Sequence, residues 1–171
     1  MIVREFEEDD ETRVKELFIL GMNEHNINKQ IHPVHFKEYI KMSLISDLSS
    51  VNENYFKETF GRVGGFWVAV DDFNIVQGMV GCQILSKDGC ELRRMSVHSD
   101  YRGRGVGRDL LNTVISHAQS QGLSQISLSC WPHQHDAIAM YRKYGFQITS
   151  EQEVGSYGVK VVFMNKSLSD A

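Results

Sequence analysis

A glycine-rich turn between an apolar run and an amphipathic stretch is the feature that most constrains how this chain can fold. The run Leu92–Val97 predicts a strand, and the sequence RGRGVG follows it at positions 102–107. Beyond the turn, residues 109–119 carry apolar side chains at helical spacing. These are Leu110, Leu111, Val114, Ile115 and Ala118. The pattern predicts a strand, a tight turn and a helix with one buried face.

The chemistry of this turn suits a phosphate group. A glycine-rich turn before a helix leaves several backbone N–H groups unpaired, and the positive end of the helix reinforces them. Gly105 and Gly107 have no Cβ, so an anion can approach the backbone closely. Arg102, Arg104 and Arg108 add cationic donors around it. The turn therefore predicts a site for a cofactor that carries a pyrophosphate.

Size and charge narrow the class of protein. A chain of 171 residues is long enough for one domain with a single core, and no linker or repeat divides it, so one domain is expected over residues 1–171. The net charge of −4 argues against a nucleic-acid partner, because no basic excess is present to neutralise a phosphate backbone. The arginines around the turn predict a discrete anion site instead.

The cysteines and the N-terminus indicate a cytoplasmic protein. Cys82, Cys90 and Cys130 are odd in number and have no paired spacing, which is typical of reduced thiols. The N-terminus lacks the pattern of a signal peptide, and no run approaches the roughly 18 apolar residues of a membrane span. No membrane partner is expected.

Periodicity predicts the remaining elements. Strands are expected at residues 2–6, 66–70, 75–85, 90–97, 125–131, 146–150 and 160–168, and the second to fourth of them form an antiparallel meander. Helices are expected from a cap at Asp9, Asp10 or Thr12 to about residue 20, then at residues 33–48, 109–119 and 135–144. The inner face of the second helix is predicted as Phe36, Tyr39, Ile40, Leu44 and Ile45. Loops are expected at residues 21–33 and 151–158, and a polar break is expected at residues 46–54.

Two motifs in this order resemble the GNAT superfamily of acetyl-CoA-dependent N-acetyltransferases. The first is Arg102, two residues, then Gly105-Val106-Gly107, and the second is Tyr141, three residues, then Gly145-Phe146. The run ELRRMSV at positions 91–97 also resembles the branch that acetylates cysteine conjugates and aspartate. The resemblance implies an α+β fold, with a splayed, mostly antiparallel sheet of about seven strands flanked by about four helices. It places the cofactor-binding core at residues 66–146.

The resemblance implies acetyl-CoA as co-substrate and assigns the residues that hold it. The pyrophosphate would bind the amides of Arg102, Gly103, Arg104, Gly105, Val106, Gly107 and Arg108. The pantetheine arm would pair with the backbone of Met95, Ser96 and Val97, like an added strand. Gln134 stands where many members have an asparagine that contacts this arm, which is a departure from the family pattern.

The resemblance also implies direct attack of an amine on the thioester. The amine must lose a proton and the leaving thiolate must gain one. Tyr141 matches the family's general acid, and Glu91 stands where part of the family carries its general base. A backbone N–H on the strand Met95–Val97 would stabilise the developing oxyanion. Two alternatives remain open: Glu91 can pair with Arg93 on the same strand face, and Tyr141 can be a packing residue.

The acceptor is expected to be the primary amine of a small molecule, because the chain carries no appended domain. Two rivals are a protein acetyltransferase acting on an N-terminus or lysine, and a non-catalytic sensor that binds acyl-CoA. The acceptor pocket is expected from residues 21–33, the second helix and residues 151–158. One of His25, His32 and His35 is expected to line it, and no metal is expected. An exposed final strand would support a homodimer.

Overall fold

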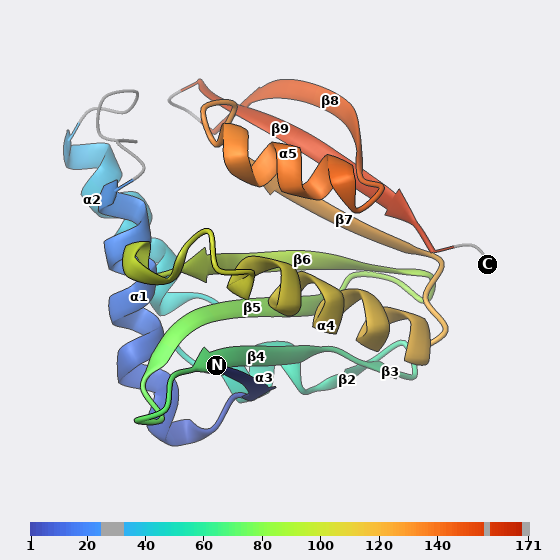
Figure 1. Cartoon of the computed structure of the whole chain (residues 1–171). Helices are drawn as coiled ribbons and strands as arrows, with labels where there is room; N and C mark the ends of the chain where they lie inside the picture. Colours follow the sequence, from blue (N-terminus) through green and yellow to red (C-terminus); the bar gives the residue numbers. More distant parts are fainter. Residues whose placement is uncertain (25–32, 156–157, 169–171) are drawn as a thin grey trace.

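The computed structural model describes residues 1–24, 33–155 and 158–168 as an α+β fold around a seven-stranded sheet (Figure 1). The strand order is β1-β4-β5-β6-β7-β9-β8, and every neighbouring pair is antiparallel except β6–β7. The strands are β1 (Ile2–Glu5), β4 (Gly65–Val70), β5 (Val76–Ile84), β6 (Gly89–Val97), β7 (Gln125–Cys130), β8 (Gln147–Val154) and β9 (Val159–Ser167). A small separate hairpin joins β2 (Glu58–Thr59) and β3 (Arg62–Val63).

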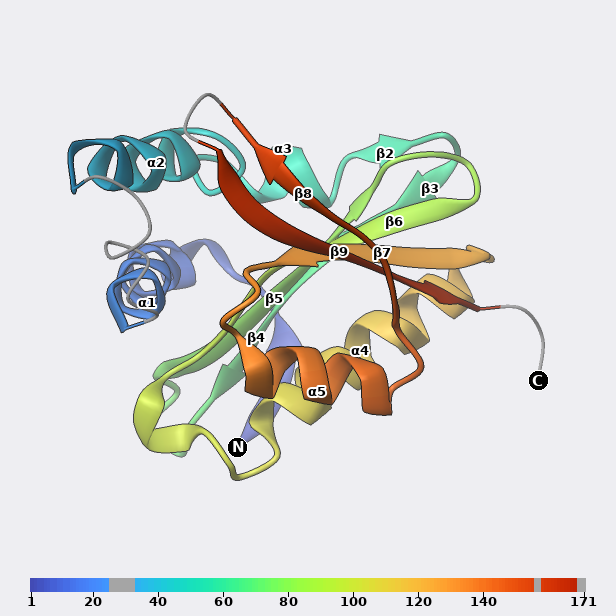
Figure 2. The same cartoon turned by 90° about the horizontal axis from the view of Figure 1, so that it is seen from above.

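Helices cover the two faces of the sheet unequally. They are α1 (Glu11–Glu24), α2 (Pro33–Ile45), α3 (Val51–Tyr55), α4 (Val106–Ser120) and α5 (His135–Lys143). Figure 2 shows α4 and α5 on one face, with α1, α2 and α3 on the other. Within the described ranges, none of these helices has the length and apolar character needed to cross a bilayer.

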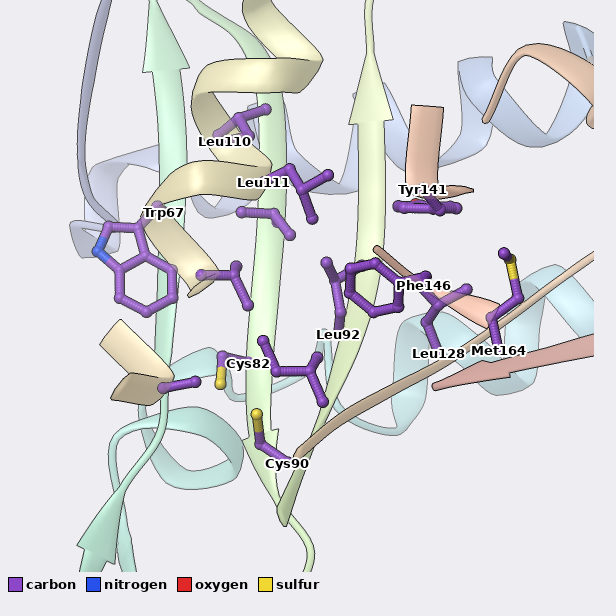
Figure 3. Packing of buried hydrophobic residues seen from close by; sticks show 14 of the residues in the cluster. Trp67, Cys82, Cys90, Leu92, Leu110, Leu111, Leu128, Tyr141, Phe146 and Met164 are labelled. Atoms are coloured by element: carbon purple, nitrogen blue, oxygen red, sulfur yellow. The ribbon is translucent and has the colours of Figure 1, made fainter. Parts of the chain in front are cut away.

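Two hydrophobic clusters lie on either side of the sheet. The cluster under α4 and α5 extends from Trp67 to Tyr141 and Met164 (Figure 3). The second cluster lies under α1 and α3 and includes Leu17 and Phe66. Every residue of β4 is buried, because alternate side chains enter the two clusters. The sheet therefore separates two hydrophobic cores and contributes side chains to both.

The predicted meander and most predicted elements are confirmed, but three elements differ in extent or were not predicted. Helix α1 continues to Glu24, into the first part of the expected loop, and Gly21 lies against β6: a Cβ at this position would be 2.8 Å from Ser96 Oγ. A fifth helix, α3, occupies a stretch predicted as a polar break. Strand β8 continues to Val154 because it pairs with β9 where a loop was predicted.

The predicted inner face of α2 is partly wrong. Phe36 is buried, but Tyr39 and Ile45 are 41% and 58% exposed. The prediction of an exposed final strand is also wrong, because β9 lies between β7 and β8 and the edge strand is β8. Helical spacing identified the helix but did not show how little of it the sheet covers.

Candidate active site

Strands β6 and β7 pair over a short distance and then separate. Within the described residues, the parallel register covers Gly89–Glu91 against Gln125–Ser127. Strand β7 continues to pair on its other side with β9, as far as Cys130 opposite Val162. Beyond this pairing the ribbons of β6 and β7 diverge toward the side on which α1 and α2 lie (Figure 1). The sheet is therefore splayed, and the β6 edge that faces β7 is free of strand pairing from Leu92 onward.

A bulge interrupts β6 where it leaves β7. Arg93 pairs with Gly81 and Ser96 pairs with Met79, so two residues of β6 stand opposite the single residue between Met79 and Gly81. The first of them, Arg94, has a φ of 57°, which is unusual for a residue other than glycine. A bulge of this kind takes backbone groups out of the ladder and re-aims them.

The predicted phosphate turn lies at the end of this strand and caps α4. Gly105 is the N-cap residue with a φ of 88°, and its carbonyl accepts a hydrogen bond from the Asp109 N–H at 3.0 Å. The amides of residues 106–108 belong to the first turn, where a helix leaves its N–H groups unpaired. Gly103 has a φ of 72°, and open space surrounds the position of a Cβ there. Both glycines need a left-handed conformation that other residues rarely adopt.

The three arginines of the turn are engaged differently. Arg102 donates from Nε to the Val97 carbonyl at 2.8 Å and forms an ion pair with Glu24 of α1. Arg108 pairs with its neighbour Asp109 at 2.9 Å. Arg104 lies over the ring of Tyr101, 5.5 Å from the centroid. Arg102 thus ties the end of α1 to the end of β6.

Tyr141 lies on α5, inside the cluster that α4 and α5 share. Its side chain is 4% exposed, and its ring is 5.7 Å from that of Phe146. Burial raises the pKa of the Tyr141 phenol, with a further contribution from Cys130. The hydroxyl is therefore protonated at neutral pH, which is the state required of a proton donor.

Glu91 lies on β6 in the short stretch that pairs with β7. Its side chain is 28% exposed, and its carboxylate is 3.7 Å from Nε of Arg93. Arg93 also donates to Gln83 Oε1 at 2.7 Å. The ion-paired alternative for Glu91 is therefore present in the structure, beside the open edge of β6.

Gln134 lies in the turn between β7 and α5, at the N-cap position of α5. Its Oε1 accepts a hydrogen bond from the Trp131 N–H at 3.0 Å. Trp131 stacks on His133 with an interplanar angle of 8°, and its ring is 5.9 Å from Tyr39 of α2. The Gln134 amide is used to shape this turn. Through Trp131, the turn touches the helix on the opposite face of the sheet.

The sequence did not point to the buried cluster formed by Asp47, Tyr55 and Arg94. Arg94 donates two hydrogen bonds to the Asp47 carboxylate, one of them 2.9 Å from Nε to Oδ2, and the Tyr55 hydroxyl donates to the same carboxylate. Asp47 follows α2, and its carboxylate is 4% exposed. The only signal in the sequence was an arginine inside a β-rich run.

Some predicted site residues fall outside the description. His25 and His32 are outside the described residues, and so is the side chain of His35. Within the described ranges, no group of three His, Cys, Asp or Glu residues is arranged to hold a metal ion. Cys82 and Cys90 are buried free thiols, and burial raises the pKa of Cys130 to about 11.

The sequence and the fold of this chain are matched among known proteins. The chain belongs to the acetyltransferase (GNAT) family, whose sequence model matches residues 29–146. Human N-acetyltransferase 8 is 33% identical over 119 residues, which are 67% of this chain and 51% of that protein. The rat protein of the same name is 32% identical over 121 residues, or 68% and 53%. The chain thus spans about half the length of the curated relatives it matches.

Solved structures agree with the fold. An acetyltransferase of the GNAT family from Staphylococcus aureus Mu50 has a TM-score of 0.77 at 22% identity, covering 98% of this chain and 99% of that chain. The PaiA N-acetyltransferase from Thermoplasma acidophilum, solved in complex with coenzyme A, has a TM-score of 0.72 at 15% identity, covering 97% and 98%. Likeness at these identities establishes the shared fold.

Proposed function

We propose that this chain transfers an acetyl group from acetyl-CoA directly to the primary amine of a small molecule. The observation that carries the proposal is the early end of the β6–β7 pairing beside the glycine turn that caps α4. An unpaired strand edge and an unpaired helix N-terminus would both leave backbone donors unsatisfied. A ligand with amide groups at one end and a pyrophosphate at the other can satisfy both.

The residues of the glycine turn fit the pyrophosphate. The amides of Val106, Gly107 and Arg108 lie at the positive end of α4, where anions are stabilised. The open space at Gly103 leaves the backbone accessible. Arg104 and Arg108 would supply further cationic donors, whereas Arg102 would act through its contact with Val97.

Strand β6 would hold the pantetheine amides with the edge that faces β7. In an antiparallel pair, every second residue of a strand directs its N–H and C=O groups toward the partner strand. The His98 N–H donates to the carbonyl of Gln77, near the start of β5, at 2.8 Å. By this alternation the backbone of Ser96 faces β5, and that of Val97 faces away. We therefore assign the pantetheine contact to Met95 and Val97, and assign Ser96 to packing against Gly21 of α1.

Two side chains would move protons. When bound, acetyl-CoA supplies an activated acetyl group and a thiol leaving group. Tyr141 would donate a proton to the departing sulfur, since its phenol remains protonated. Glu91 would accept the amine proton, directly or through water, from its place beside the open edge. The raised pKa of Cys130 keeps that thiol neutral, which favours direct transfer over an acyl-cysteine.

A turnover screen with calorimetry tests the proposal. The pure protein is titrated with CoA and acetyl-CoA, and thiol release is then measured with small amines and with peptides that offer an N-terminus or lysine. Acetyl-CoA binding together with transfer to small amines is the expected result. Transfer to peptides alone would favour a protein acetyltransferase. Binding without any transfer would favour a sensor, and no binding at all would overturn the proposal.

A further inference from the structure

The buried contact between Asp47 and Arg94 joins two distant parts of the chain at the bulge of β6. Nε of Arg94 is 2.9 Å from Oδ2 of Asp47, and a second guanidinium nitrogen bonds the other oxygen. The side chains are 9% and 4% exposed. Tyr55 and Ser46 also donate to the carboxylate, Ser46 at 3.0 Å. The contact has the bidentate geometry that fixes both partners in orientation.

The contact lies at a strained position of the backbone. A φ of 57° at a residue with a Cβ is a strained conformation, and it persists only where surrounding contacts impose it. Two contacts hold the Arg94 side chain: the Asp47 carboxylate, and the ring of Phe18 in α1, whose centroid is 5.0 Å away. The guanidinium thus belongs to one of the two residues that form the bulge, and its contacts hold that residue's side chain in place.

Stability alone gives little reason for a buried ion pair here. Burial acts to raise the pKa of Asp47, but the hydrogen bonds and charge of Arg94 lower it to about 2, so the pair is ionised at neutral pH. Desolvating two charges costs about as much as their attraction returns, and apolar replacements are often equally stable. A role in fixing local geometry accounts for the pair better.

We propose that Asp47 and Arg94 are positioning residues that hold the bulge of β6, so that the main chain at Met95 faces the space between β6 and β7. This inference rests on the proposed function, in which Met95 contacts the pantetheine arm, and it adds that the Met95 N–H stabilises the oxyanion. Since Asp47 follows α2 and Phe18 lies on α1, the contact also connects the bulge to the elements of the opposite face. A loosened bulge would lower turnover more than co-substrate affinity, because the pyrophosphate binds elsewhere.

The test compares this pair with a matched pair elsewhere in the chain. Arg4 of β1 and Asp10 form a bidentate contact of 2.7 and 2.9 Å, with Asp10 6% exposed, at the far edge of the sheet. The site variants are Asp47→Asn and Arg94→Lys, and the controls are Asp10→Asn and Arg4→Lys. Each is measured for hydrogen exchange of the Arg93 and Ser96 amides, CoA affinity by calorimetry, kcat and unfolding.

The site variants are expected to exchange these two amides about tenfold faster and to lose at least about tenfold in kcat, less than the 10²–10³-fold cost of removing an oxyanion donor. CoA affinity should stay within about threefold, and the controls should change neither exchange nor kcat. Unchanged exchange, or a kcat loss no larger than in the controls, would overturn the proposal.

A double variant covers the case in which a single variant does not fold. Asp47→Leu with Arg94→Met replaces the ion pair by apolar side chains, which preserves stability in comparable pairs. It is expected to fold and still to show the faster exchange and lower kcat; a fully active double variant would refute the positioning role. Hydrogen exchange needs no turnover, so the state of the bulge is measured even if the wild-type protein transfers no acetyl group.

Discussion

The two halves of the sheet differ in how they are covered. The first half, β1, β4, β5 and β6, has helices on both faces, and β4 is buried throughout. The second half, β7, β9 and β8, carries α5 on one face, and from Glu151 to Val154 every residue of β8 is exposed. The candidate site lies where the two halves part. In the proposed function, the first half binds the co-substrate and α5 on the second half donates the proton.

The largest expected effect concerns stability. Leu110 lies on α4, which packs on the first half of the sheet, and its side chain is fully buried. Leu110→Ala should lower the free energy of unfolding by about 3 kcal/mol, because it leaves a cavity between the helix and the sheet. Ile148→Ala in the partly buried β8 should cost about 1 kcal/mol. Denaturant unfolding measures both. Equal losses would mean that the two halves are equally well packed.

The next effect concerns turnover. Tyr141→Phe should lower kcat about 10²-fold by removing the general acid, and should leave CoA affinity nearly unchanged. The matched control is Tyr144→Phe, which removes a hydroxyl at the C-terminal end of the same helix. The kcat is measured by thiol release. If the kcat of Tyr141→Phe equals that of the wild type, Tyr141 is not the proton donor and the second half has no such role.

A smaller effect concerns acid stability at the bulge. The folded-state pKa of Asp47 is about 2, below its ordinary value of 3.8. Its contribution, about 2 kcal/mol, is therefore present above about pH 4 and lost as the pH falls toward 2. Asp47→Asn should flatten this part of the curve of unfolding free energy against pH. A curve parallel to that of the wild type would show that Asp47 does not carry the dependence.

The smallest effect concerns binding. Gly105→Ala forces a side chain into a φ of 88° beside the Arg108 guanidinium, which would lie 2.9 Å from the new Cβ, and should weaken CoA binding about tenfold. Gly155→Ala is the control, since it places the same strain at a φ of 70° in the turn after β8. Calorimetry measures both. Equal CoA affinities in the two variants would show that the co-substrate does not bind at the turn of Gly105.

Local patterns predicted the parts of the fold that depend on neighbouring residues. The glycine turn, the helix after it and the three-stranded meander follow from periodicity and turn chemistry, and the family resemblance added the splay. The C-terminal end of α1 was not predicted correctly, because glycine has a low helix propensity and Gly21 therefore indicated a loop. The contact between Gly21 and Ser96 depends on the folded structure and leaves no local pattern in the sequence.

The positioning pair could not be read from the sequence for a similar reason. Asp47 and Arg94 are far apart in the chain, and a single aspartate in a polar stretch has no periodicity. Their contact depends on the bulge, which in turn depends on the register of β6 against β5. The role expected of Gln134 depends in the same way on a partner, Trp131, that only the folded chain identifies. The pairing of Glu91 with Arg93, by contrast, was one of the alternatives that strand periodicity predicted.

The outer strand β8 has a consequence for self-association. An uncovered sheet edge is a template for a neighbouring chain, and proteins often protect such edges with charge. Glu151 and Glu153 are both exposed on this strand. A second molecule adding itself antiparallel along β8 would bring carboxylates close to their own counterparts, which repel across a strand pair. This acidic border disfavours edge-to-edge polymerisation of the sheet.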